Sequence, residues 1–319
     1  MNVRVDRMGV MKFSQGQAIV LALLLTAVVL TVGLAVVSQS VVDVRTSTQS
    51  QEVVQAFSAA EAGIQQSLNQ AVSLGQMSPV SGNVGNGSFN ATIAALGEGD
   101  EQYVFPRDMV SGDAQTLWFV SHSAGGDLGC PCSSLTSGST FKVYWGKQGM
   151  TGSEVPALVL DVYYKSPAGG PDYSNIKVAR AAYDPAARAN SFTSSGINSA
   201  GYTLLGQPFG YYTTVDLGAA GLNVDTYSSS DGIQMIRARI LYSTGTAQPV
   251  GFDFTGSGLV TGTNSGLASQ GFIPDSQGSV GVSGTATSAT IHLTSVYAYP
   301  DPPSVFDYAI FGGAGSILK

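Results

Sequence analysis

The most continuous hydrophobic run of the chain lies near its N-terminus. From Ala18 to Val37, only Thr26, Thr31 and Gly33 interrupt a series of aliphatic residues, and no charge or proline occurs among them. An α-helix rises about 1.5 Å per residue, so this run spans roughly 30 Å, the thickness of the hydrocarbon core of a bilayer. The pattern therefore predicts a transmembrane helix at about residues 18–38.

A second pattern, with helical periodicity, follows the apolar run without a break. Apolar residues recur at spacings of three and four, which places them on one face of a helix, while Gln, Ser and charged residues fill much of the rest. The first proline of the chain is Pro79. We therefore expect one helix over residues 17–74, roughly 87 Å long. The residues of its amphipathic stripe are Val53, Phe57, Ala60, Ile64 and Leu68.

The charges before the apolar run indicate how this helix is oriented. Arg4, Arg7 and Lys12 outnumber the single acid Asp6, and such basic residues keep the N-terminus in the cytoplasm. A secretory signal peptide has a shorter apolar region and a small-x-small cleavage site, which the residues 36–40 do not provide. The sequence predicts a single-pass protein of the cytoplasmic membrane with its ectodomain outside.

Beyond a linker rich in Gly, Asn and Ser, the hydrophobic pattern changes to short runs. Apolar and aromatic residues occur in stretches separated by Gly, Pro and Asn, as in strands. The fold class expected is α+β: the long helix, then an antiparallel, sandwich-like β-rich ectodomain. The stretch YDPAARANS suggests a division into residues 75–187 and 188–319, and one continuous domain is the alternative. Clear candidate strands lie at residues 88–96, 157–165, 233–242 and 288–299.

Charge excludes one class of partner. Charged residues make up only 11% of the chain, the net charge is −7, and the densest basic pair is Arg237 and Arg239 on one expected strand. Binding to phosphates requires clustered Lys and Arg, so we expect no nucleic-acid partner.

The two histidines, His122 and His292, are the candidates for general acid–base chemistry. A catalytic histidine must lie between a nucleophile and a carboxylate, and no G-x-S-x-G motif is present. His292 lies in an alternating segment, where a hydrogen-bonded structural histidine is the simpler interpretation. We therefore expect no catalysis, and a membrane-anchored extracytoplasmic hydrolase is the least favoured function.

The two cysteines are candidates for a local disulfide. Cys130 and Cys132 flank one proline, and an oxidising exterior favours a bond between them, with free thiols as the alternative. Together with His122 they also offer three zinc-type ligands, but structural zinc sites usually require four ligands and C-x₂₋₄-C spacing. The acidic group Glu98, Asp100 and Glu101 lacks a calcium-loop pattern and is better explained as a solvated turn. We expect neither a metal nor a cofactor.

Two stretches resemble a known family. The segment KFSQGQAIVLALLL places a basic leader ending in glycine before the apolar run, as in prepilins, and AFSAAEAGI resembles the region after the membrane segment in PilX-type minor pilins. The resemblance covers roughly residues 10–70. It implies a leader at residues 1–16, cut by a prepilin peptidase between Gly16 and Gln17, and assembly with other pilin-like subunits through the helix.

One position departs from the pattern of the main pilus subunits. Most of them carry a glutamate four residues after the first mature residue, and this chain has Leu21 there. In the family, that glutamate pairs with the N-terminal amine of a neighbouring subunit, so its absence implies a minor or tip subunit.

These expectations combine into one function and its rivals. The sequence predicts a structural minor pilin-like subunit of a type IV pilus or a related secretion or adhesion filament. The helix is held by membrane lipid before assembly and lies in a filament at the bacterial cell surface afterwards. Filament packing is expected to involve Leu21, Val53, Phe57, Ile64 and Leu68. The main alternative is a membrane-anchored adhesin or binding protein of the cell surface.

Overall fold

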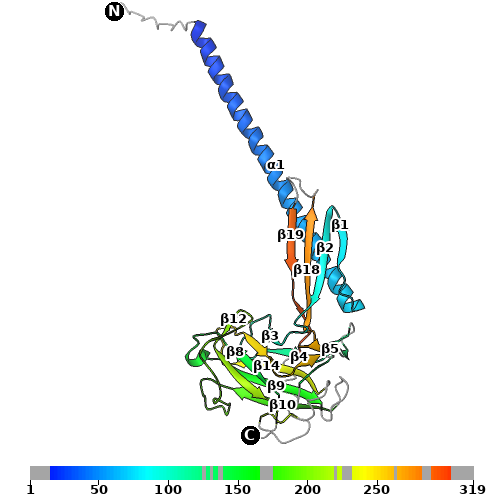
Figure 1. Ribbon diagram of the computed structural model, residues 1–319. Coiled ribbons are helices and arrows are strands. Elements are labelled where there is room, and N and C mark those ends of the chain that lie inside the picture. The colour runs from blue at the N-terminus through cyan, green and yellow to red at the C-terminus, as the bar shows by residue number, and fades with distance from the viewer. Residues whose placement is uncertain are drawn as a thin grey trace, which may run out of the picture.

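The computed structural model describes most of the chain after the expected leader. The described residues are 15–123, 127–129, 132–135, 139–165, 175–218, 221–224, 232–261, 264–281 and 289–302, with the side chains of residues 15–17, 264 and 265 left aside. One long helix runs from the N-terminal side, a narrow sheet packs along its second half, and a larger β-rich body follows at the far end of that sheet (Figure 1). The expected α+β class is confirmed.

The helix α1 (Gln15–Leu74) has 60 residues and is therefore about 90 Å long. It begins two residues before the expected start and ends where it was expected. Gly75 terminates it by adopting a φ of 64°, which costs glycine little, and its N–H donates to the carbonyl of Ala71 over 3.0 Å.

The sheet beside the helix is antiparallel, in the order β1-β2-β18-β19, and β20 pairs with the start of β18. On β2 the side chains alternate strictly between buried and exposed, because one face meets α1 and the other meets solvent. We call this sheet the helix sheet. Its strands are β1 (Val80–Val84), β2 (Gly87–Ala95), β18 (Gly271–Val280), β19 (Ala289–Thr294) and β20 (Tyr297–Ala298).

The body contains two four-stranded antiparallel sheets that share one hydrophobic core. Trp145 and Phe252 from one sheet and Leu160 and Ile236 from the other are fully buried in that core. One sheet has the order β10-β9-β14-β4, with bounds Ile176–Tyr183, Ala157–Lys165, Ile233–Leu241 and Ala114–Trp118. The other has the order β13-β8-β15-β3, with bounds Tyr211–Asp216, Thr140–Trp145, Val250–Asp253 and Gln102–Val104.

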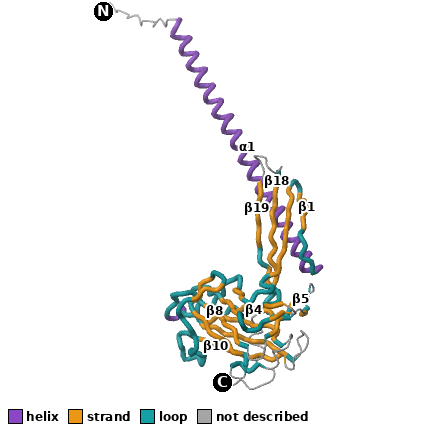
Figure 2. The backbone as a smooth tube through the Cα atoms, in the orientation of Figure 1, coloured by secondary structure: helices purple, strands orange, loops and turns teal. Residues whose placement is uncertain are grey.

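Short strands, connected by loops, complete the body (Figure 2). They are β11 (Tyr202–Leu204) with β12 (Gln207–Phe209), β5 (Ser121–His122) with β6 (Leu128–Gly129), and β16 (Val260–Thr261) between β7 (Ser133–Ser134) and β17 (Asn264–Ser265). A 3₁₀ turn lies at Gly152–Glu154. Among the described residues, α1 is the one α-helix.

The order of strands shows that the body is inserted into the helix sheet. The chain leaves the helix sheet after β2 and returns to it at β18, and these two strands are paired neighbours, with Ala95 opposite Phe272. Strands from both sides of residue 187 share the sheets of the body: β9 pairs with β14, and β8 pairs with β13. The boundary between the helix sheet and the body therefore lies at residues 95–96 and 270–271.

Candidate functional site: the surfaces of the long helix

The first half of α1 exposes its apolar side chains on every face. From Ile19 to Val44, the large aliphatic side chains are between 47% and 65% exposed. Among the described residues, this is the one helix long and apolar enough to cross a membrane. The two threonines of the run do not present free hydroxyl groups, because Thr26 donates to the carbonyl of Leu23 over 2.9 Å and Thr31 to that of Val28 over 2.8 Å. Such internal hydrogen bonds suit a helix surrounded by lipid or by other apolar helices.

The second half of α1 docks on the helix sheet through a stripe of small residues. These residues recur at spacings of three and four and are buried, most of them completely. Small side chains allow the backbones of helix and sheet to approach closely, as they do between packed helices. We call this set the small-residue stripe: Ala56, Ala59, Ala60, Gly63, Ser67 and Ala71.

Two glycines show how close this approach is. A Cβ atom at Gly278 of β18 would lie 2.1 Å from the carbonyl oxygen of Ala56 and 2.5 Å from the nitrogen of Ala60, both in the backbone of α1. A Cβ at Gly63 of the helix would lie 2.2 Å from the hydroxyl of Ser276. The docked geometry therefore requires glycine at position 278, where the obstacle is helix backbone, and leaves little room for a side chain at position 63, where Ser276 and Phe89 would have to move.

The larger apolar residues of the expected stripe lie beside this docked face. Val53 and Phe57 are 46% and 43% exposed, and Ile64 and Leu68 are half-buried. Leu21, in the first half of the helix, is 64% exposed. The helix sheet thus packs against the small residues of α1 and leaves the large apolar residues partly accessible. The sequence analysis placed Ala60 on the apolar face of the helix, and Ala60 is fully buried, but it missed the other members of the small-residue stripe, although their spacing is visible in the sequence.

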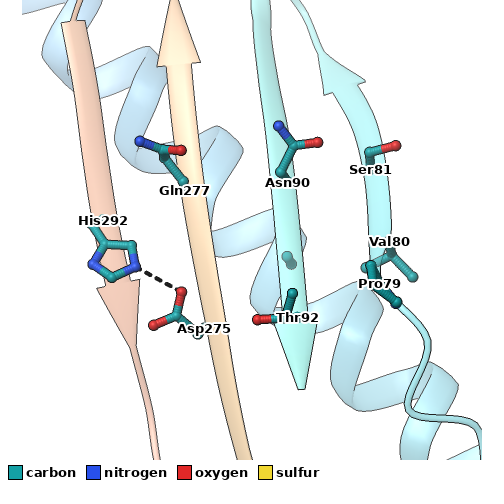
Figure 3. Close-up of a pocket in the computed structure, with 9 residues that line it drawn as sticks. Pro79, Val80, Ser81, Asn90, Thr92, Asp275, Gln277 and His292 are labelled. Carbon is teal, nitrogen blue, oxygen red and sulfur yellow. Dashed lines mark hydrogen bonds and ion pairs between the residues drawn. The ribbon is translucent and has the colours of Figure 1, made fainter. Parts of the chain in front are cut away.

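The outer face of the helix sheet is polar. Ser81, Asn90, Gln277 and His292 form one row across four strands, because they are register partners in sequence from β1 to β19. With Asp275 and Thr92 they line a hollow of about 460 Å³ on the face turned away from α1 (Figure 3). This face is solvated, as expected for the open side of an antiparallel sheet.

His292 is held by an acid on the neighbouring strand. Its Nε2 lies 2.7 Å from Oδ1 of Asp275, and the hydroxyl of Thr294 donates to Oδ2 of the same carboxylate over 2.8 Å (Figure 3). Ser81, the serine in the same hollow, is three strands away from His292, roughly 14 Å at the usual strand spacing. A Ser–His–Asp arrangement is therefore not formed with Ser81, and the bonded histidine fits a structural role.

We expect the Asp275 pair to make a small, acid-sensitive contribution to stability. The hydrogen bond from Thr294, and then the contact with His292, lower the pKa of Asp275 below its ordinary value. A lowered pKa stabilises the fold above the unfolded pKa, and this contribution is lost as the pH falls through the folded pKa. Asp275→Asn should cost less than about 1 kcal/mol at neutral pH, since the pair is largely exposed.

Urea unfolding of the wild type and of Asp275→Asn at pH 7 and pH 3 measures this effect. The difference in unfolding free energy between the two proteins should shrink at the lower pH. Asp100→Asn, in a solvated turn, is the matched control. An equal difference at both pH values would contradict the assignment.

His122 lies at the junction of α1, the helix sheet and the body. Its ring is 4.2 Å from that of Tyr299 and 4.5 Å from that of Trp118, measured between centroids. Burial lowers its pKa to about 4, so it is neutral at physiological pH. It borders a cavity of about 550 Å³ between the end of α1 and the body. Its buried Nδ1 has no hydrogen-bond partner among the described residues.

The remaining candidates from the sequence are the two cysteines, the acidic group and the leader residues. Cys132 is 2% exposed and is disulfide-bonded, and Cys130 lies outside the described residues. Glu98 and Asp100 are exposed in a turn that begins at Gly97, and Glu101 is half-buried. Within the described part of the chain, no three His, Cys, Asp or Glu side chains are grouped so that they could hold a metal ion. The leader residues before Gln15 lie outside the described part, and Gly16 and Gln17 are described only as helix backbone.

A free apolar half and a docked amphipathic half fit a helix that is anchored in a membrane or assembled with other apolar helices. The comparison with known families is more specific: residues 15–65 match the PilX N-terminal model. The N-terminal part of this chain is therefore PilX-like, consistent with a type IV pilin-like protein of the PilX type. PilX proteins are structural components of pili. No curated protein and no solved structure matches the chain.

Proposed function

We propose that this protein is a minor pilin-like subunit of a type IV pilus or a related secretion or adhesion filament, assembled through α1. One observation carries the proposal: the helix that matches the PilX model exposes its large apolar residues along its first half and still exposes Val53 and Phe57 in the half that docks on its own sheet. Exposed apolar surface of this extent requires cover by lipid or by other proteins. Neighbouring helices of the same kind supply that cover in a filament.

In this proposal the helix changes its surroundings once. Before assembly, residues 18–38 lie in the cytoplasmic membrane, with the basic residues Arg4, Arg7 and Lys12 inside. A prepilin peptidase then cuts after Gly16, and the helix moves from lipid into a bundle of similar helices. Phe57 and Val53, just beyond the membrane segment, gain apolar contacts there at about 25 cal/mol per Å² buried.

Leu21 supports a minor position rather than the main subunit position. A buried charged amine without a partner is costly in an apolar environment. A leucine here cannot pair with the N-terminal amine of an adjacent subunit as the glutamate of main subunits does. The subunit is therefore suited to a place where that contact is not required.

We expect the mature protein to begin at Gln17. Mass spectrometry of the N-terminus, on protein taken from cells that produce the filament, measures this directly. Gly16→Leu should leave the N-terminus uncut, whereas Gly33→Leu should not affect cleavage, because a side chain at Gly33 has no atom within 4 Å. An intact Met1 in the wild type, or cleavage near Ser40, would contradict the proposal.

A shearing experiment separates the proposal from a permanently anchored adhesin. A filament subunit should appear partly in the sheared fraction together with the main pilin. An anchored adhesin should remain entirely in the membrane fraction. Recovery of the wild type only in the membrane fraction, in cells whose filaments are sheared off, would favour the adhesin.

A further inference from the structure

We infer that the chain consists of two units with separate tasks: α1 with the helix sheet forms a complete assembly unit, and the inserted body, residues 96–270, is a display unit. The display unit folds independently of helix docking and makes no assembly contact. The assignment of tasks rests on the proposed function, whereas the independence of the two folds does not.

The two units have separate hydrophobic cores. The large core of the body draws its buried residues from positions 96 to 267, and none comes from α1, β1, β2 or β18. The small core of the assembly unit contains Ala59, Phe89 and Ala91, with Ala62 and Val80 packed against it. A unit that has its own hydrophobic core meets the main condition for folding independently.

The chain passes from the helix sheet into the inserted body and back again at one place. Ala95 and Phe272 are paired across β2 and β18, so the body enters and leaves the helix sheet at adjacent backbone positions. Insertions are tolerated where the ends of the inserted domain lie close together, because the host strands keep their pairing. The strands that hold α1 therefore belong to the assembly unit on both sides of the insertion.

The units meet through a limited set of contacts beside the insertion points. Gln270, the last residue of the body, is 2% exposed and binds the backbone of Trp118 within the body through its side chain. Its backbone carbonyl connects the units, because it accepts from the N–H of Tyr299 over 3.0 Å. Ile273 and Tyr299 from the assembly unit pack against buried residues of the body, and Asp301, just after β20, is hydrogen-bonded to Thr116 of β4. Beside these contacts lies the cavity of about 550 Å³, so the end of α1 is not closely packed against the body.

The two tryptophans of the chain allow each unit to be followed in the intact protein. Both Trp118 and Trp145 lie in the body, and Trp145 is completely buried in its core. In a Trp118→Phe background, which removes the tryptophan at the junction, fluorescence reports on the body alone. Incorporation into sheared filaments reports on the assembly unit.

The test uses two full-length variants in that background, one in each unit. Gly278→Val obstructs docking of α1 and should abolish incorporation while leaving the fluorescence melting temperature unchanged. Phe119→Ala opens a cavity in the body and should lower that melting temperature by roughly 10 °C. At a temperature where its body is still folded, Phe119→Ala should be incorporated like the wild type.

Two results would overturn the inference. The first is that Gly278→Val lowers the melting temperature of the body as much as Phe119→Ala does, which would make the chain one cooperative unit. The second is that Phe119→Ala with a folded body is excluded from filaments, which would give the body a part in assembly. If the wild type is absent from filaments, the proposed function fails, and the fluorescence result still decides whether the units fold independently.

Discussion

Replacing Gly278 by valine should detach the second half of α1 from the helix sheet. The first new atom would lie 2.1 Å from the carbonyl oxygen of Ala56, and that atom belongs to helix backbone, which cannot turn aside as a side chain can. Overpacking a close contact usually costs 1–3 kcal/mol. Because the obstacle here is backbone, we expect a loss of about 3 kcal/mol or more for the docked unit.

Hydrogen exchange of the backbone amides of β2 and β18 measures this loss. Gln277→Val is the matched control, because residue 277 is adjacent on the same strand and points to solvent on the other face. The control should leave exchange in both strands at the wild-type rate. Wild-type protection in Gly278→Val would mean that the helix is not held by this contact.

The second large effect is expected in the body, at the buried carboxylate of Asp161. Asp161 is 1% exposed on the central strand β9, and Arg180 on β10 contacts both of its oxygens, Nε with Oδ1 over 2.5 Å and one terminal nitrogen with Oδ2 over 2.9 Å. Arg239 of β14 approaches Oδ2 to 3.9 Å. The carboxylate thus neutralises cations on both neighbouring strands.

Asp161→Ala should lower the unfolding free energy of the body by about 3 kcal/mol, because it removes a buried carboxylate that accepts two hydrogen bonds from Arg180 and lies near the buried Arg239. Thermal unfolding followed by tryptophan fluorescence gives the value. Asp108→Ala removes an acid from an exposed pair with Lys147, at 3.0 Å, and should cost less than about 1 kcal/mol.

A double variant tests whether the loss comes from the ion pair. Asp161→Ala with Arg180→Ala should lose clearly less than the sum of the two single variants, because removing both partners leaves no unpaired charge at that contact. Additive losses would show that Asp161 acts through something other than Arg180.

The long helix could be predicted from the sequence almost to its ends. Its apolar run, its helical spacing and the absence of proline before Pro79 are local signals, and the structure places α1 at Gln15–Leu74. Strands such as β9 and β14 were also predictable, because each is a short apolar run between turn residues.

The face by which α1 docks could not be selected by hydrophobicity. Large residues such as Phe57 and Ile64 dominate the apolar pattern, but the sheet packs on the alanines beside them. The reason lies in Gly278, more than two hundred residues further along the chain, which lets the sheet backbone reach the helix. The match between the small residues of α1 and the glycine of β18 becomes apparent only when the helix and the strand are both in position.

The insertion of the body also depends on a distant pairing. Residues 87–95 pair with residues 271–280, and no local pattern indicates that two strands so far apart are neighbours. The sequence division near residue 187 followed a proline- and alanine-rich stretch, and that stretch forms a loop organised by Asp184 within the body. The Asp184 carboxylate accepts hydrogen bonds there from Arg188 and Asn190.

The position of β18 and β19 also affects the order of events during synthesis. The ribosome makes α1, β1 and β2 early, but β18 and β19, which complete the sheet over the small-residue stripe, emerge only after the whole body has been made. A nascent or truncated chain that ends before residue 271 therefore has a helix able to enter the membrane but no finished partner for its second half. The second half of the helix can therefore dock fully only after the last strands of the helix sheet have been synthesised.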